Sequence, residues 1–284
     1  MKHILRPSDF SENSWNATAY AVHLFQNEEC TFHLFHSYTP LIYHVEYVLI
    51  NPAQYGLGDT RRDTAVKNLE SLKKRILEQL HPCTNHTFET VARFDSLVNG
   101  ISQLLTERMI DFIVMGTKGA TGAEEFLFGS NTVQVFKQLK CPMIVVPTQF
   151  QYKAPSNILF STDYNRFYCE AELQPLKAIV DLHKATINIL HVNPKLKLND
   201  IQNYNMTMLC TYLNQYRHCF YTLPSPSKKS KAIEEFIEEL HIDMLVMVKY
   251  NHSLVEALFN EPIIKKLVFH PSVPILIIPD ITHK

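Results

Sequence analysis

The stretch MGTKGATGAEEFLFGSNT (residues 115–132) holds four of the seven glycines in this 284-residue chain. The run DFIVMG (111–116), typical of a buried strand, leads into it, and NTVQVFKQL (131–139) follows with the spacing of a helix. Glycines let the backbone approach a ligand closely, and a helix N-terminus attracts anions. The stretch is therefore a candidate phosphate-binding loop. The alternative is an ordinary turn in which Ser130 caps the helix.

The two halves of the chain resemble each other. The matched pairs are ILRPSDF (4–10) with ILFSTDY (158–164), CTFHLFHSY (30–38) with ATINILHVN (185–193), DFIVMG with DMLVMV (243–248), and CPMIVVP (141–147) with VPILIIP (273–279). Their common order along the chain indicates a tandem duplication. We expect one domain over residues 1–150 and a second, shorter in its middle, over residues 155–284.

Short apolar runs alternate with amphipathic stretches in both halves. The strands expected in the first half are HILRPS (3–8), TFHLFHS (31–37), TFETVAR (87–93), DFIVMGT (111–117) and PMIVVPT (142–148). The apolar helix faces expected from their spacing are Ala65, Leu69, Leu72, Ile76 and Leu80 in the first half and Ile233, Phe236, Ile237 and Leu240 in the second. This alternation predicts an α/β protein with two tandem, doubly wound parallel sheets.

Polar residues follow three of the expected strands in the first half. They are Pro7, Ser8 and Asp9 after the first strand, His36, Ser37 and Tyr38 after the second, and the glycine stretch ending in Gly129, Ser130 and Asn131 after the fourth. In open parallel sheets, ligands bind outside the carboxyl ends of the strands. We therefore expect a binding site at this edge, with two alternatives left open: Asp9 as a helix N-cap and His36 as a plain strand-end residue.

Composition excludes several classes of function. The formal net charge is −1, so no general basic field favours nucleic acid or an anionic membrane. No apolar run reaches the roughly 20 residues that a membrane-spanning helix needs. The six cysteines form no CxxC pair, which favours reduced thiols in the cytoplasm over a disulfide framework or a zinc site, and we name no metal-binding residues.

The first copy resembles the universal stress protein family, and the whole chain resembles a tandem two-domain member of it. The opening ILRPSDFSENSWNA, the strand end LFHSY, and the glycine stretch followed by CPMIVVP carry the likeness. The family motif is a glycine, two residues, a glycine, nine residues, then glycine and serine or threonine, and Gly116, Gly119, Gly129 and Ser130 have that spacing. The resemblance implies an adenine-nucleotide alpha-hydrolase-like, Rossmann-like fold that binds ATP.

The resemblance also implies roles for particular residues. It places Pro7, Ser8 and Asp9 near the base and sugar, the backbone of Ser37 at the adenine, Met115 and Gly116 at the ribose and phosphate entry, and Gly119, Gly129, Ser130 and Asn131 around the phosphates. Lys118 lies in the same loop, where its charge would help to neutralise phosphate. A magnesium ion on the phosphates is left open.

The second copy departs from the motif at each of these glycines. Val248, Asn251, Glu261 and Pro262 stand where the first copy has Gly116, Gly119, Gly129 and Ser130. A glutamate would repel phosphate, and a proline removes a backbone N–H. We expect the second domain to be a structural or regulatory partner, and the two domains to form a pseudo-twofold pair through their apolar last strands.

The function expected is ATP binding in a cytoplasmic stress-response protein, with the nucleotide acting as a switch or sensor. One alternative is a slow ATPase or another phosphoryl-transfer enzyme, although no catalytic residue is identified and the P-loop order is absent from the sequence. Another is an interaction module that binds no nucleotide. Further homo-oligomerisation and protein partners are left open.

Overall fold

The computed structural model describes residues 1–38, 57–117, 130–138, 140–192, 197–223, 229–249 and 272–280. Contacts divide the chain into two compact units, whose described parts end at Cys141 and begin at Pro142. We call them unit 1 and unit 2. The domain assignment of 1–150 and 155–284 stays a prediction.

Unit 1 is a parallel sheet with the strand order β3-β2-β1-β4. Its elements are β1 (Lys2–Pro7), α1 (Glu12–Leu24), β2 (Cys30–Tyr38), α2 (Leu57–Gln79), β3 (His86–Phe94), α3 (Leu97–Glu107), β4 (Phe112–Gly116) and α4 (Ser130–Gln138). The predicted apolar face of α2 is buried at Ala65, Leu69, Leu72 and Ile76, while Leu80 lies just beyond the end of the helix. The strands and this helix are confirmed.

Unit 2 has the strand order β5-β10-β9-β6-β7-β8. Its elements are β5 (Met143–Val146), β6 (Asn157–Ser161), the short 3-10 helix η3 (Glu170–Leu173), α5 (Gln174–His183), β7 (Thr186–Val192), α6 (Asp200–Tyr212), β8 (His218–Leu223), α7 (Lys229–Glu239), β9 (Met244–Lys249) and β10 (Ile275–Pro279). All of these pairs are parallel except β5 with β10. The last strand of the first copy therefore pairs with the last strand of the second.

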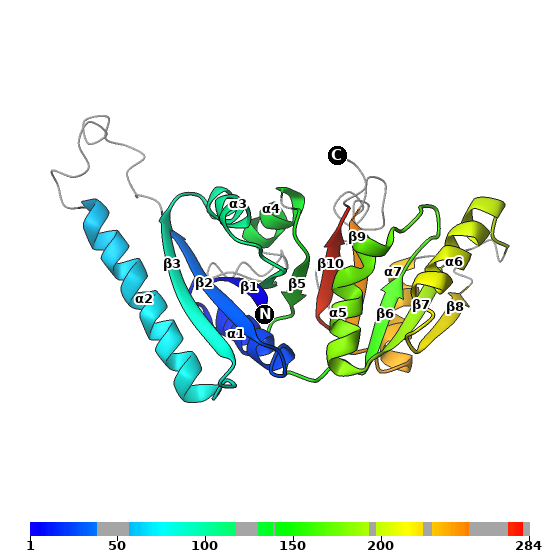
Figure 1. The fold of residues 1–284 in the computed structure, drawn as a ribbon, viewed down its shortest axis with the longest axis horizontal. Helices are drawn as coiled ribbons and strands as arrows, with labels where there is room; N and C mark the ends of the chain where they lie inside the picture. Colours follow the sequence, from blue (N-terminus) through cyan, green and yellow to red (C-terminus); the bar gives the residue numbers. More distant parts are fainter. Residues whose placement is uncertain are drawn as a thin grey trace. The chain divides into compact units, whose positions relative to one another are not determined.

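The order β3-β2-β1-β4 in unit 1 recurs as β8-β7-β6-β9 in unit 2. In unit 1, α2 packs on β2 and β3 and α3 packs against α4, as Figure 1 shows. Because the chain moves from β1 outward to β3 and then returns to β4, the strand order reverses between β1 and β4. The fold is the predicted α/β, doubly wound class, and the carboxyl ends of β1 and β4 are the place where such sheets bind ligands.

An aspartate just before β4 in unit 1, and just before β9 in unit 2, fixes the start of the matching strand, β1 or β6. In unit 1, His3 N donates to Asp111 Oδ2 at 2.7 Å, and Asp111 N donates to the His3 carbonyl at 2.9 Å. In unit 2, Asn157 N donates to Asp243 Oδ2 at 3.0 Å, and Asp243 N donates to the Asn157 carbonyl at 2.8 Å. The duplicated sequence thus builds the same local structure twice.

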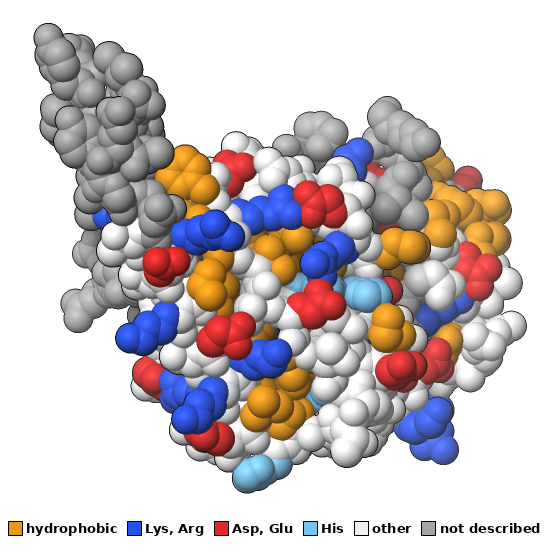
Figure 2. Space-filling view, turned by 60° about the vertical axis from the view of Figure 1, so that its left-hand side comes forward, with side chains coloured by type: hydrophobic (Ala, Val, Ile, Leu, Met, Phe, Trp, Pro, Cys, Tyr) orange, Lys and Arg blue, Asp and Glu red, His pale blue; other side chains and the backbone are white. Residues whose placement is uncertain are grey.

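The surface seen in Figure 2 mixes charges of both signs with hydrophobic side chains, so that face carries no extended basic area. Every helix in the described ranges falls short of the length and hydropathy that crossing a bilayer demands. All six cysteines are free thiols.

A buried histidine lies in a polar cluster on the unit 1 sheet. Arg108 donates to His33 Nδ1 at 2.7 Å and also pairs with Glu89. His33 Nδ1 also lies 3.3 Å from Glu89 Oε2, and His33 Nε2 lies 3.0 Å from His3 Nδ1. Burial, and then the positive charge of Arg108, lower the pKa of His33 to about 4. The folded protein therefore keeps His33 neutral at pH 5.

This histidine should make stability depend on pH. Between about pH 4 and pH 6.5 the unfolded chain binds a proton at His33 that the folded chain does not, so the free energy of unfolding falls as the pH falls. We expect His33 to account for a loss of about 2 kcal/mol between pH 7 and pH 5. Urea unfolding of His33→Leu at both pH values should show a smaller loss than the wild type. The control His23→Leu, on α1, should follow the wild type, and equal losses in all three proteins would contradict the prediction.

Candidate nucleotide site at the strand ends of unit 1

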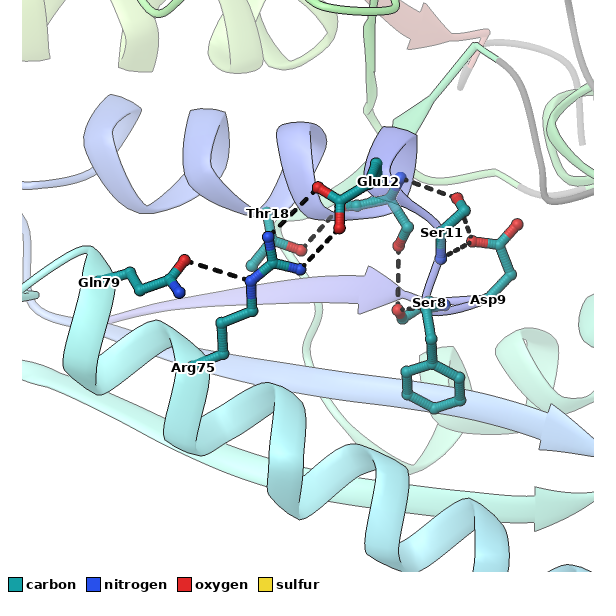
Figure 3. A network of polar contacts seen from close by, with 9 residues as sticks. Ser8, Asp9, Ser11, Glu12, Thr18, Arg75 and Gln79 are labelled. Atoms are coloured by element: carbon teal, nitrogen blue, oxygen red, sulfur yellow. Dashed lines mark hydrogen bonds and ion pairs between the residues drawn. The ribbon is translucent and has the colours of Figure 1, made fainter.

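The turn after β1 is built around Ser8 and Asp9 (Figure 3). Ser8 Oγ accepts a hydrogen bond from Phe10 N at 3.1 Å. Asp9 Oδ1 accepts from Ser11 N at 3.1 Å and from Ser11 Oγ at 2.7 Å. Phe10 has φ 62°, in the left-handed region that residues other than glycine rarely adopt. This turn holds Asp9, partly exposed, at the carboxyl end of β1.

The first turn of α1 follows directly. Its N-cap is Ser11, whose side chain accepts from Ser14 N at 3.1 Å, so the alternative of Asp9 as the cap is wrong. Arg75 of α2 donates to Glu12 at 3.0 Å and lies 3.9 Å from the ring centroid of Trp15 (Figure 3 shows the Arg75–Glu12 pair). The start of α1 is therefore fixed both by the Asp9 turn and by α2.

The end of β2 is joined to the same turn. His36 Nδ1 lies 2.7 Å from the Ser8 carbonyl, and because a carbonyl only accepts, Nδ1 carries the proton. The His36 ring packs on Phe10 with a centroid distance of 4.6 Å. Ser37 is partly exposed and lies opposite Arg93 in the β2–β3 register. His36 is a structural strand-end residue here, which is the alternative left open for it.

The end of β4 packs tightly against α1. A Cβ added to Gly116 would lie 2.7 Å from Asn13 Nδ2 and 3.1 Å from the Asn13 carbonyl oxygen. Thr132 Oγ1 donates to the Gly116 carbonyl at 3.0 Å, which links β4 to α4. Met115 is buried. Gly116 thus has a packing reason of its own, because only glycine allows the first turn of α1 to lie this close.

The structure brings the ends of the neighbouring strands β2, β1 and β4 together. Ser8 and Asp9 lie in the turn between β1 and α1, and Gly116 at the end of β4 lies against Asn13 of α1. Lys118, Gly119 and Gly129 lie outside the described residues. The α4 helix begins at Ser130, one residue before the predicted start, so Ser130 is its first residue, and Asn131 is exposed in the first turn. Within the described residues, no group of three His, Cys, Asp or Glu side chains has the arrangement of a metal site.

Unit 2 repeats three hydrogen bonds of this turn. Tyr164 N donates to Thr162 Oγ1 at 3.0 Å, Asn165 N donates to Asp163 Oδ1 at 3.0 Å, and His191 Nδ1 donates to the Thr162 carbonyl at 3.0 Å. Tyr164 has φ 55°, matching Phe10. The strand-end turn is therefore part of the fold and does not by itself indicate a ligand.

The strand end of unit 2 is covered by its own helix α6. Gln202 Nε2 donates to the Asp163 carbonyl at 2.9 Å and to Asn165 Oδ1 at 3.1 Å. The buried Asn205 donates to the Tyr164 carbonyl at 2.8 Å. These amides tie α6 to the strand-end turn of unit 2, while the Asp163 side chain stays partly exposed.

A buried arginine below the unit 1 turn was not foreseen. Arg6 is 1% exposed and donates to the carbonyls of Val114 and Ser14 and to Thr18 Oγ1. Burial lowers the pKa of Arg6 to about 9, and the negative charge of Asp9 opposes this shift, so Arg6 stays charged at pH 7. The signal available in the sequence was the match of ILRPSDF with ILFSTDY, in which Arg6 stands against Phe160.

Comparison with known proteins identifies the family. The family model described as the universal stress protein family matches residues 1–147, more than half of the chain. The chain belongs to the universal stress protein family. A universal stress protein of Methanocaldococcus jannaschii is 44% identical over 48 residues, which are 17% of this chain and 28% of that relative. The chain thus matches less than a third of the length of this curated relative.

Solved universal stress proteins extend the likeness to the whole fold. One from Archaeoglobus fulgidus matches 98% of this chain and 98% of its own with a TM-score of 0.65 and 15% identity. This match covers both units and shows the shared Rossmann-like fold. Another from the same organism, in complex with dAMP, matches 44% of this chain and 99% of its own, with a TM-score of 0.34 and 11% identity.

Proposed function

We propose that unit 1 binds ATP at the carboxyl ends of β1 and β4 and that the bound nucleotide acts as a switch in a cytoplasmic stress response. The observation that carries the proposal is the glycine motif of the family, complete at Gly116, Gly119, Gly129 and Ser130, which runs from the last residue of β4 to the first residue of α4. The topology supports it, because the strand order reverses between β1 and β4.

The roles proposed for the residues follow this geometry. Asp9, whose Oδ1 holds Ser11, is proposed to accept from a ribose hydroxyl or a base amine. The backbone of Ser37 is proposed to bind adenine. Lys118, Gly119, Gly129, Ser130 and Asn131 are proposed to bind the phosphates, with magnesium on the phosphate oxygens, and Pro7, Ser8, Met115 and Gly116 to line the sugar.

Unit 2 is proposed to be a structural or regulatory partner that binds no triphosphate. Its motif positions carry Val248, Asn251, Glu261 and Pro262, and Gln202 of α6 donates to the Asp163 carbonyl at the strand end. The antiparallel pairing of β5 with β10 supports an intrachain pair through the last strands. The proposal therefore requires one nucleotide per chain.

The test is to purify the protein from cells, denature it, and identify any released nucleotide by chromatography. We expect an adenine nucleotide at up to one per chain. For protein stripped of nucleotide, ATP with magnesium should raise the melting temperature, with the gain increasing with ATP concentration. Absence of both released nucleotide and thermal shift would refute ATP binding.

A further inference from the structure

The buried guanidinium of Arg6 has only neutral hydrogen-bond acceptors among the described residues. Nε lies 3.1 Å and Nη2 2.8 Å from Thr18 Oγ1, Nη2 lies 2.7 Å from the Ser14 carbonyl and 3.2 Å from Ser14 Oγ, and Nη1 bonds to the Val114 carbonyl. Burying a charge costs free energy unless an opposite charge or ligand compensates it. The negative charge of Asp9 acts on Arg6 from the strand-end turn and raises the pKa of Arg6 against the effect of burial.

Arg6 lies directly below the candidate site. Ser14, which accepts from Arg6, donates through Oγ to Ser8 Oγ at 2.9 Å, so one hydrogen-bond chain runs from the guanidinium to the strand-end turn. Val114, its other partner, is two residues before Gly116, which is about 7 Å along a strand. At that distance a positive charge inside the protein still acts on a ligand outside the strand ends.

Unit 2 has no cation at the position that Arg6 occupies in unit 1. Phe160 stands where unit 1 has Arg6, and its ring packs edge-on against Tyr168 at a centroid distance of 5.5 Å. Tyr168 stands where unit 1 has Ser14. Its hydroxyl lies 2.8 Å from Thr162 Oγ1, in the same way that Ser14 Oγ bonds to Ser8 Oγ in unit 1. The polar link to the turn is therefore kept, while the cation at the position of Arg6 is replaced by an aromatic ring and the guanidinium of Arg166 lies 5.7 Å from the Tyr168 ring centroid.

The position of Thr18 carries a buried carboxylate in unit 2. Glu172 is 1% exposed and shares the guanidinium of Arg166 with Asp280, at 2.7 Å and 3.3 Å. Two carboxylates thus share one arginine in the unit that lacks the glycine motif. The unit that has the motif carries the buried cation of Arg6, on which the negative charge of Asp9 acts from the turn.

We infer that the buried charge of Arg6 makes the unit 1 site selective for phosphorylated over unphosphorylated nucleosides. The inference rests on the proposed function and adds a residue that lies beneath the site. Arg6 acts through its electric field, since each of its three nitrogens already donates within the protein, to Val114, Ser14 or Thr18. A phosphate chain carries several negative charges and adenosine carries none, so the field of Arg6 favours only the former.

The test compares two substitutions that differ in charge. Arg6→Lys keeps the positive charge with fewer donors, and Arg6→Gln keeps hydrogen bonding without charge. The affinities of ATP and adenosine for the full chain would be measured by calorimetry at fixed ionic strength. We expect Arg6→Gln to weaken ATP about tenfold while adenosine changes less than twofold, and Arg6→Lys to keep the wild-type ratio of the two affinities.

A purely structural role of Arg6 predicts another result, because distortion of the site would weaken ATP and adenosine by the same factor in both variants. That outcome, or an unchanged ratio in Arg6→Gln, would overturn the inference. If Arg6→Gln does not fold, the double variant Arg6→Phe/Ser14→Tyr copies the packing of unit 2. It should show the same fall in ATP affinity relative to adenosine affinity. A wild-type protein that binds neither ligand would instead refute the proposed function, and the inference with it.

Discussion

Substitution of glutamate for Gly129 is expected to weaken ATP binding at least tenfold. The second copy of the duplication carries Glu261 at this position, next to Pro262, where the first copy has glycine and serine. A carboxylate there would repel the phosphates, and the loss of a hydrogen bond to a charged group costs a further ~1.5–3 kcal/mol. Calorimetric titration of the wild type and the variant with ATP and magnesium measures the effect.

Two further variants test whether a loss of ATP affinity in Gly129→Glu comes from the unit 1 site. Glu261→Ala changes the matching position of the second copy and should leave the ATP affinity within twofold of the wild type. Gly116→Val copies Val248 of the second copy and should also weaken ATP binding. The Cβ of the valine would lie 2.7 Å from Asn13 Nδ2 and would force the first turn of α1 to move. An unchanged affinity in Gly129→Glu would mean that the phosphates bind elsewhere.

The fold could be predicted from the sequence because its signals are local and occur twice. Apolar runs such as DFIVMG and DMLVMV mark strands in each copy, and the i, i+3, i+4 spacing from Ala65 to Ile76 marks the buried face of α2. The N-cap of α1 was harder to predict from the sequence, because the stretch DFSENS (residues 9–14) contains several residues that could cap a helix. Ser11 takes the role because the positive φ of Phe10 turns the chain so that Asp9 binds Ser11.

The site was only partly accessible from the sequence. The glycine spacing is a local pattern, and it located the end of β4 and the start of α4. Arg6 was missed because its partners Ser14, Thr18 and Val114 come from two other elements, and a charged residue within a strand pattern does not reveal whether it is buried. The hydrogen bond from Gln202 to the Asp163 carbonyl could not be predicted from the sequence for the same reason, because only the tertiary structure brings α6 to that strand end.

Substitution of alanine for Asp243 is expected to lower the free energy of unfolding by about 3 kcal/mol or more. The buried Asp243 carboxylate accepts from Ser156 N at 2.9 Å, Ser156 Oγ at 2.8 Å and Asn157 N at 3.0 Å, and it pairs with Lys153 at 2.6 Å. These contacts fix the start of β6, the central strand of the duplicated order in unit 2. Urea unfolding followed by circular dichroism at pH 7 measures the loss.

The duplication supplies the matched control, Asp111→Ala. The carboxylate of Asp111 is exposed and accepts from His3 N at 2.7 Å, so its removal should cost only about 1 kcal/mol. The loss in Asp243→Ala should also depend on pH. Burial opposes ionisation of Asp243, yet Lys153, Asn157 and Ser156 hold its pKa below the ordinary value.

A depressed pKa gives Asp243 a stabilising effect that is present above the pKa of the unfolded chain and is lost as the pH falls through the folded value. The stabilities of the wild type and Asp243→Ala should therefore converge in acid below about pH 4. Equal losses for Asp243→Ala and Asp111→Ala at pH 7 would show that burial of this carboxylate adds nothing to the shared hydrogen bond at the start of the first strand.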